Sequence, residues 1–581
     1  MKKISRRDFI KVTAAGMGAL AISTGLMGCS SDDDGNAPYQ VTFSHGVASG
    51  DPLSDRVIIW TRALPDDTGA DVSVSWEVAD DAGFTNLLHT GSTQTSAAQD
   101  FTVKVDVLNL QPGATYYYRF TSNGATSPAG VTKTLPTVSP EQVKFAVFSC
   151  ANYPAGHFNV YAEAALHDDL DAVIHLGDYI YEYGAGGYAT EDAAAIGRTL
   201  PDNNANEILT LADYRKRYAL YRSDANLQAL HRKTPFITVW DDHEIADDTW
   251  KSGAKNHNEG EGEFEDRKVA ALQAYFEWMP IRPVVDDSQE IIYRQFQFGD
   301  LVSLYMLDTR VLARDKQLDY LDYLDPVSGA FNAPQFSADV SDANRTLLGA
   351  EQRDWLQNAM AASNATWQVL GQQILMGRML LPAELLTQLL DPDPNTILPA
   401  FAELANIKGR ILMGDPSVTD AERARVETVL PYNLDAWDGY AAEREVLFET
   451  AKAMNKNLVA LAGDTHNAWA SDLKTLSGDH VGVEFATASV SSPGLETYLS
   501  LPDDATTIAQ TELGVTTLVS DLRYLNVNQR GYLLTTFTAD EARADWRFVD
   551  TVKSPTYQLA AARSVSYKTL PGQNDRKLIE I

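Results

Sequence analysis

The sequence predicts an N-terminal all-β sandwich followed by an α/β domain of layered β-sheets flanked by helices. Between residues 41 and 137, short runs with alternating apolar residues, such as VSVSWEV and FTVKVDV, are separated by turn residues. After Pro140 the runs become continuously apolar and alternate with helical stretches, as in DAVIHLGD and NLVALAGDTH. A chain of 581 residues also exceeds what one ordinary core supports, so two domains are expected.

The first 28 residues have the organisation of a targeting segment. A basic start that contains Arg6 and Arg7 precedes a short apolar centre and the run LMGC, which ends at Cys29. The apolar centre is shorter than the roughly 20 residues that a membrane span needs. We therefore predict a twin-arginine lipoprotein signal peptide over residues 1–28, lipid attachment at Cys29 and a polar tether over residues 29–40. The expected partner is the twin-arginine export machinery, and the expected location is membrane-anchored, in the periplasm or on the cell surface.

The sandwich of residues 41–137 is expected to be fibronectin-like. In LQPGATYYYRF, Pro112 and Gly113 precede Tyr116, which is similar to the tyrosine-bearing corner of such domains. No cluster of catalytic residue types occurs in this range. The sequence therefore assigns the chemistry to the second domain.

Residues 141–560 are predicted to form that catalytic domain, and residues 561–581 a C-terminal tail. Nearly every apolar run in the domain ends in residues that can do chemistry. Ligands of open α/β sheets collect beyond the carboxyl ends of the strands, so these residues are expected to converge on one crevice. They are Cys150, Asp178, residues 241–244 (DDHE), Asp308 and residues 464–466 (DTH).

Charge and cysteine content exclude two classes of protein. The formal net charge of -32 argues against stable nucleic-acid binding, because that affinity comes mostly from Lys and Arg. Only 2 Cys are present, and Cys29 is the expected lipid site. Cys150 then has no partner within the mature chain, so an internal disulfide framework is excluded.

The strand-end residues together predict a multinuclear metal site. The carboxylates of Asp178, Asp242 and Asp464 would repel one another in one crevice unless cations neutralise them. Asp178 could bridge two ions. Phenolate and thiolate favour a highly charged transition ion, whereas carboxylates suit Ca²⁺, Mg²⁺ or Mn²⁺. The remaining donors are the imidazole of His466, the phenol of Tyr181 and the thiol of Cys150.

Several blocks resemble a known family. GDYIY (177–181), WDDHE (240–244) and GDTH (463–466) are similar to the ordered metal-binding blocks of calcineurin-like and purple-acid-phosphatase-like metallophosphoesterases. With SHGVASGDPLSDRVIIWTR near the start, SC at 149–150 and LDTR at 307–310, the resemblance narrows to the PhoD-type alkaline phosphatase family. It implies a β-sandwich ahead of a metallophosphoesterase domain, and hydrolysis of both phosphate monoesters and diesters.

The resemblance also implies a ligand set. An Fe³⁺ would be bound by Cys150, Asp178, Tyr181 and His466, and Asp178 would bridge to a neighbouring Ca²⁺ site that Asp242 and Asp464 help to form. Asp242 stands where the general pattern has Asn, and Asp464 where it has His. Both differences add an oxygen donor, which agrees with the oxygen preference of Ca²⁺.

Other residues near these blocks have two interpretations each. His243 either orients its loop or hydrogen-bonds the phosphate and protonates the leaving oxygen. Arg267 is the preferred phosphate-binding arginine, although a solvated helical charge is the ordinary alternative. Residues 247–248 could be extra ligands or loop residues. Residues 308–310 are expected to brace the crevice, and His175 is expected to be a core histidine.

The functional prediction is an exported alkaline phosphatase that hydrolyses small phosphate esters by metal-activated attack on phosphorus. A dedicated phosphodiesterase, similar to a phospholipase D in its substrates, is the first alternative. A non-catalytic lipoprotein that binds at the cell surface is the second. Every expected ligand block retains an oxygen, sulfur or nitrogen donor, which favours catalysis.

Overall fold

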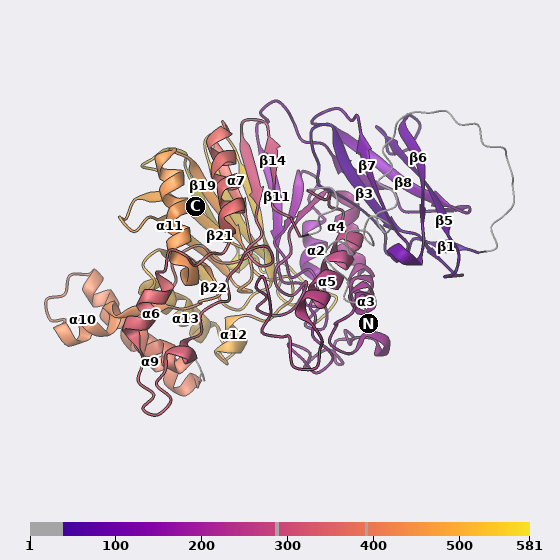
Figure 1. Cartoon of the computed structure of the whole chain (residues 1–581). Helices are drawn as coiled ribbons and strands as arrows, with labels where there is room; N and C mark the ends of the chain where they lie inside the picture. The colour runs from indigo at the N-terminus through magenta and orange to yellow at the C-terminus, as the bar shows by residue number, and fades with distance from the viewer. Residues whose placement is uncertain (1–38, 285–289, 390–392) are drawn as a thin grey trace.

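The computed structural model describes residues 39–284, 290–389 and 393–581 (Figure 1). The expected signal peptide, with Arg6 and Arg7, and the lipid site Cys29 lie outside the described residues. The described chain is mostly β-strands in its N-terminal part and mixed α/β in the rest, as the sequence predicts. Two large sheets pack face to face at its centre, with helices on their outer faces.

The first large sheet has ten strands. Four parallel strands (β11, β12, β13 and β2) form its middle, and antiparallel strands extend it on both sides. In spatial order the strands are β26 (Ile579–Glu580), β25 (Val565–Thr569), β24 (Ala542–Phe548), β23 (Gly531–Phe537), β11 (Val143–Phe148), β12 (Ala172–His175), β13 (Phe236–Thr238), β2 (Val47–Gly50), β3 (Arg56–Arg62) and β7 (Thr102–Leu108).

The second large sheet has seven strands, of which β15, β16, β19 and β21 are parallel. All residues of β15 and β16 are buried, because the facing sheet covers one side and helices cover the other. In spatial order the strands are β14 (Arg294–Phe298), β15 (Val302–Met306), β16 (Trp367–Gly371), β19 (Asn457–Ala462), β21 (His480–Ala486), β20 (Ala468–Lys474) and β22 (Leu522–Asn526).

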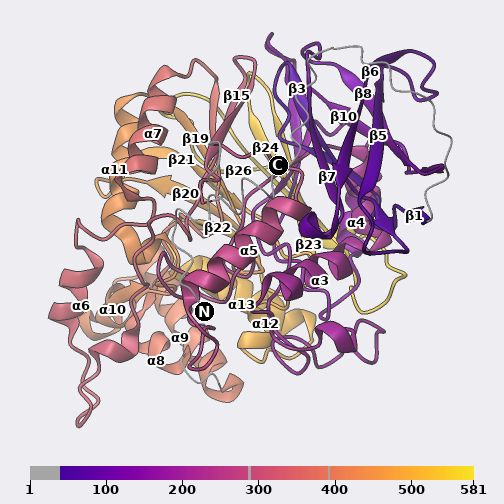
Figure 2. The ribbon, with the colours of Figure 1, turned by 45° about the vertical axis from the view of Figure 1, so that its right-hand side comes forward.

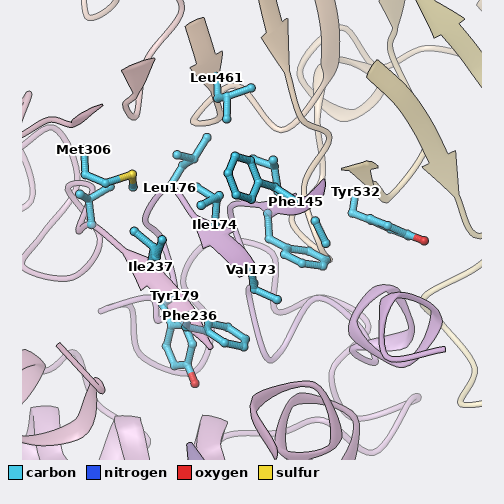
Figure 3. Close-up of a cluster of buried hydrophobic side chains, with 14 of the residues drawn as sticks. Phe145, Val173, Ile174, Leu176, Tyr179, Phe236, Ile237, Met306, Leu461 and Tyr532 are labelled. Carbon is cyan, nitrogen blue, oxygen red and sulfur yellow. The ribbon is translucent and has the colours of Figure 1, made fainter. Parts of the chain in front are cut away.

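The core between the two sheets is continuous. Figure 3 shows Phe145, Ile174 and Ile237 of the first sheet near Met306 and Leu461 of the second. All of these side chains are fully buried. Burial of one such side chain stabilises the fold by about 1.5–3 kcal/mol, so this layer fixes the relative position of the strand ends.

Helices cover both outer faces. The helices that pack on the first sheet are α2 (Asn159–Ala164), α3 (Leu211–Arg222), α4 (Ala225–Lys233) and α5 (Phe264–Trp278), and those on the second are α7 (Gly349–Ala362) and α11 (Ala441–Ala453). A further group lies at one end of the molecule (Figure 2). It comprises α6 (Ala333–Val340), α8 (Ala383–Leu389), α9 (Pro394–Leu412), α10 (Asp420–Glu427), α12 (Leu495–Tyr498), α13 (Ala505–Leu518) and the short pair β17 (Leu380–Pro382) and β18 (Val429–Pro431). In the described ranges, no helix has the length and apolar character needed to cross a membrane.

The N-terminal strands form two packed β-layers. One layer is a separate five-stranded sheet, in which β5 alternates buried and exposed residues. Tyr116 accepts a hydrogen bond on its hydroxyl from the backbone N of Gln111, five residues earlier in the chain, at 2.7 Å. The separate sheet comprises β5 (Val72–Ala79), β6 (Leu87–Thr95), β8 (Thr115–Ser122), β9 (Ala125–Thr126) and β10 (Gly130–Lys133), and β1 (Val41–Thr42) pairs with β4 (Leu64–Pro65) beside it.

The other N-terminal layer belongs to the ten-stranded sheet. β2 pairs in parallel with β13 through Gly50 and Phe236. A Cβ on Gly50 would lie 2.4 Å from the carbonyl oxygen of Pro280, so only glycine fits at this junction. Asp51 follows and accepts hydrogen bonds from Arg294 at 2.6 Å and from the backbone N of Arg282 at 2.8 Å. The N-terminal region is therefore joined to the second domain by a shared sheet and buried ion pairs.

The segment expected to be a C-terminal tail is also part of this sheet. β25 pairs with β24, and β26 pairs with β25. Tyr567 is buried in the main core. The prediction of a tail over residues 561–581 is therefore wrong, because these residues complete the edge of the ten-stranded sheet.

Candidate metal centre and active site

The residues that end the central strands meet at one place between the two large sheets. Cys150 follows β11, Asp178 follows β12, Asp241 and Asp242 follow β13, and Asp464 follows β19. Their side chains approach one another as the sequence predicts, because the parallel strands in each sheet end at the same edge.

Four of the site residues have left-handed backbone conformations. The φ angles are 61° at Cys150, 54° at Asp178, 63° at Asp464 and 65° at His466. Such conformations cost about 1–3 kcal/mol each in residues other than glycine and persist where the surroundings impose them. The tight turns that follow the buried strands impose them here, and they direct four potential donor side chains toward one crevice.

The donor atoms fall into overlapping groups. In each group the potential ligand atoms lie within 4.8 Å of one another. Asp178 belongs to two groups and Asp242 to three, so a bridging carboxylate has the position it needs. The groups are Cys150 with Asp178 and His466; Asp178 with Asp242 and His243; Asp241 with Asp242 and Asp464; and Asp242 with Asp247 and Asp248.

The Tyr181 hydroxyl lies beside the first of these groups. It lies 3.1 Å from Asp178 Oδ2 and 3.1 Å from His466 Nε2, and it accepts a hydrogen bond from Ser492 at 2.7 Å. His466 Nδ1 lies 2.7 Å from the carbonyl oxygen of Pro493, which holds the ring. Four donors of different chemistry thus surround one point.

The electrostatics of this group fit a bound cation. Among the described residues, Asp178 Oδ1 is buried and has no hydrogen-bond partner. Burial, with additional repulsion from Asp241 and Asp242, raises the pKa of Asp178 well above its ordinary value. Burial and the charge of Asp178 likewise raise the pKa of the Cys150 thiol, and burial lowers the pKa of His466 to about 3, which leaves a neutral imidazole. A cation at this point would stabilise the ionised forms of Asp178 and Cys150 and would therefore oppose the rise in their pKa values.

Two glutamates hold the loops around the donors. Glu244 accepts hydrogen bonds from the backbone N–H groups of Asp178 at 2.9 Å and Asp241 at 2.7 Å. Glu182 accepts one from the backbone N of Asp247 at 2.9 Å. Burial raises the pKa of Glu244 to about 7. Sequence reasoning missed both clamping roles, although both residues lie inside or next to the quoted blocks.

His243 lies between the carboxylates and Glu182. Its Nδ1 is 2.7 Å from Glu182 Oε2, and one ring nitrogen belongs to the group with Asp178 and Asp242. Burial disfavours the imidazolium, but the charges of Glu182, Asp178 and Asp242 outweigh burial and raise the pKa of His243 well above its ordinary value. A protonated, oriented imidazole at this position can donate a hydrogen bond to an anion.

Arg310 is the buried counter-charge of the group that contains Asp241, Asp242 and Asp464. It comes from the LDTR block after β15 and is fully buried. It donates from Nε to Asp241 at 2.5 Å, from Nη2 to Asp464 at 2.8 Å and from Nη1 to Asp435 at 2.7 Å. The expectation that residues 308–310 brace the crevice matches this position, and Asp308 accepts from the backbone N of Arg310 at 2.8 Å.

The structure does not bring Arg267 to the donor groups. This arginine lies on α5, and its guanidinium is buried, so it is not a solvated helical charge either. It donates to the Tyr214 hydroxyl at 3.1 Å, the carbonyl oxygen of Asn256 at 2.7 Å and Glu207 at 2.8 Å. These contacts occupy the guanidinium, so the expected role in phosphate binding has no geometric support. Arg267 braces the loop that contains Asn256.

The structure also places the other residues that the sequence analysis singled out. His175 is fully buried and its Nε2 lies 2.8 Å from the Tyr161 hydroxyl, so it is a core histidine as expected. Asp247 and Asp248 lie beside Asp242 and form ion pairs with Lys255 at 3.6 and 3.3 Å. Their position is compatible with extra ligands at the rim of the site.

Comparison with known proteins agrees with this geometry. The PhoD-like phosphatase family matches residues 145–546, and the N-terminal domain of PhoD-like phosphatases matches residues 28–136. Alkaline phosphatase D of Bacillus subtilis (strain 168) is 34% identical over 543 residues, which cover 90% of this chain and 81% of that protein. A solved structure of PhoD aligns with a TM-score of 0.71 and 32% identity over 95% of this chain and 93% of that one. This chain therefore belongs to the PhoD-like phosphatase family and is a phosphatase.

Proposed function

We propose that this chain is an exported alkaline phosphatase that hydrolyses small phosphate monoesters and diesters at a centre of Fe³⁺ and Ca²⁺. The observation that carries the proposal is the position of Asp178. Its carboxylate lies between a group that contains thiol, phenol and imidazole donors and a group that contains only further carboxylates and His243. The first donor set suits a highly charged transition ion and the second suits a hard divalent cation.

The residues present fit these ions. Cys150, Asp178, Tyr181 and His466 would hold Fe³⁺, and Asp178 with Asp242 and Asp464 would hold Ca²⁺. When bound, such ions neutralise the charge of a phosphate ester and activate an oxygen nucleophile. The side chains of this chain position the donors, exclude bulk water and keep His243 in place through Glu182. From there His243 would donate a hydrogen bond to the phosphate or a proton to the leaving oxygen.

Turnover of chromogenic esters tests the proposal. We expect release of p-nitrophenol from both p-nitrophenyl phosphate and bis-p-nitrophenyl phosphate, with activity lost on chelation and restored by Ca²⁺. Hydrolysis of the diester alone would favour the dedicated phosphodiesterase. If the fully metallated protein turned over neither ester, a binding role would replace the catalytic one.

The donor set around Tyr181 leads us to expect a spectroscopic signature. A thiolate and a phenolate on Fe³⁺ should both transfer charge to it, so the protein should absorb visible light, whereas zinc or calcium alone would leave it colourless. Tyr181→Phe should shift or weaken the band, and Cys150→Ser should also lower the iron content, as measured by absorption and elemental analysis. Turnover should fall by about tenfold or more, since even outer partners of metal ligands cost about 10–100-fold.

The matched control is Tyr183→Phe. The Tyr183 ring is in the same loop and packs on His243 with ring centroids 5.4 Å apart, so it tests general disturbance of the loop. The band should survive this substitution. An active protein that is colourless and free of iron would contradict the iron assignment and leave a phosphatase that uses divalent ions alone.

Export by the twin-arginine route and lipid anchoring rest on the sequence of the first 29 residues. Replacement of Arg6 and Arg7 by Lys should leave precursor in the cytoplasm. Cys29→Ala should prevent lipid attachment and release the protein from the membrane fraction without lowering turnover. Fractionation and activity of the two variants check this, and undiminished membrane association of Cys29→Ala would contradict the lipoprotein assignment.

A further inference from the structure

A cavity of about 590 Å³ adjoins the carboxylate groups. Two of its lining residues belong to the surroundings of the site. The backbone N of Asp248 donates to Asp242 Oδ2 at 2.6 Å, and Asp435 accepts from Arg310 at 2.7 Å. A phosphate ester bound at the site could therefore extend its organic part into this cavity.

Aromatic side chains form part of the cavity wall. Trp250, Tyr320 and Tyr432 come from three different segments of the chain, and all three line the cavity. The polar atoms of two of them are already used: Tyr320 donates to the carbonyl oxygen of Pro431 at 2.6 Å, and Trp250 Nε1 donates to Ser252 at 3.2 Å. Their remaining surface is apolar, which lowers the local dielectric and strengthens any ionic contact made there.

Two lysines also line this cavity, and they differ in their partners. Lys255 pairs with Asp247 and Asp248. Lys316 is exposed, and its ammonium group lies 5.5 Å from the centre of the Trp250 ring. Within the described parts of the chain, no carboxylate lies within ion-pair distance of Lys316. Lys316 is therefore a cation held in place by an aromatic ring and available to an anion.

The acidic residues in the cavity wall have partners or structural roles in most cases. Asp435 pairs with Arg310 and Arg314, and Asp248 pairs with Lys255. Asp319 accepts from the backbone N of Leu321 and caps the short helix that begins at Tyr320. The cationic partners of Asp435 and Asp248 reduce the negative potential that would otherwise oppose an anion near Lys316.

We propose that this cavity binds the organic part of the phosphate ester and favours esters that carry a second negative charge, which Lys316 contacts. The inference rests on the proposed function, and it narrows the substrate class to small esters with a further carboxylate or phosphate group. The protein as a whole has a formal net charge of -32, which disfavours additional negative charge on a substrate. A preference for the more anionic ester would therefore be a local effect of this cavity.

Two aryl monoesters test the proposal in the metallated full-length protein. Phenyl phosphate and para-carboxymethylphenyl phosphate differ by one carboxymethyl group, whose carboxylate is remote from the reacting phosphorus. The ratio of kcat/KM for the carboxymethyl ester to that for phenyl phosphate should be about threefold to fivefold at low salt, as for an exposed ion pair, and should fall as salt is added. Lys316→Gln should bring the ratio to about one through KM, and Lys316→Glu should invert it.

Lys577→Gln is the matched control, because Lys577 is an exposed lysine in the C-terminal segment. It should keep the wild-type ratio. Inhibition constants of benzylphosphonate and para-carboxymethylbenzylphosphonate give a second readout that does not depend on turnover, and Lys316→Gln should remove their difference. Equal ratios in wild type, Lys316→Gln and Lys577→Gln, with both esters hydrolysed, would overturn the subsite alone. Hydrolysis of neither ester by the wild type would overturn the proposed function, and the subsite with it.

Discussion

Asp178→Asn should remove at least about 99% of the turnover on p-nitrophenyl phosphate and lower the metal content of the purified protein. Asparagine keeps the size of the side chain but loses the negative charge that two cations would share. Outer partners of metal ligands already cost about 10–100-fold, so a bridging ligand should cost at least the upper value. Steady-state kinetics and elemental analysis measure the two effects. Near-normal turnover with a normal metal content would exclude the proposed centre.

The same substitution should have a different effect on stability. In the metal-free protein the buried carboxylate of Asp178 has a raised pKa and one oxygen without a partner, so its ionised form is destabilising near neutral pH. Asp178→Asn should therefore leave the metal-free Tm unchanged or higher, while the gain in Tm on adding metal should shrink. Asp171→Asn, at the opposite end of β12, is the control and should keep both the metal-induced gain and the turnover.

Arg310→Met should lower the free energy of unfolding of the metal-free protein by about 3–5 kcal/mol, the range for removing one partner of a buried ion pair. Its guanidinium is the shared partner of Asp241, Asp435 and Asp464, and all three carboxylates would lose it. Burial and repulsion from Asp242 already oppose ionisation of Asp241, whose pKa is raised to about 7 even beside Arg310. Urea unfolding in the presence of a chelator measures the loss.

Arg310→Lys should recover part of the stability, because an ammonium group replaces the charge but not the three separate contacts. Arg423→Met is the matched control. Arg423 pairs with Glu427 at 3.1 Å on an exposed helix face, and such pairs contribute about 0–1 kcal/mol. If Arg310→Met and Arg423→Met cost the same, Arg310 would not be the counter-charge that holds the carboxylates together.

The sequence predicted which residues converge on the crevice, because they lie just beyond the ends of buried strands. Continuous apolar runs identify those strands, and the ends of parallel strands meet at one edge, so the meeting of Cys150, Asp178 and Asp464 follows from periodicity and topology together. The sequence did not indicate which residues hold these side chains in place. The contacts of Glu244 with the backbone of residues 178 and 241 depend on turns with left-handed conformations, which the apolar pattern does not encode.

Arg267 is a residue for which the sequence predicted a role that its contacts do not support. Its helical spacing was correct, but spacing alone does not identify the element that faces each side of a helix. Tyr214 and Glu207 lie well before it in the sequence, and their contacts fill its guanidinium. The shared sheet was missed for a similar reason. Pairing of Gly50 with Phe236 joins distant segments, and no local pattern in either segment indicates its partner.

The ten-stranded sheet has a consequence for how the chain reaches its final shape. Its members include Val47 near one end of the described chain and Glu580 near the other, and β11 lies directly between β12 and the much later β23. Pairings between such distant segments form slowly, because a long loop must close before any contact is gained. A growing polypeptide on the ribosome therefore carries β11 with one open edge until β23 emerges. Unpaired edges of this kind are where chains aggregate, so biosynthesis of this protein should depend on chaperones that shield β11 until β23 is made.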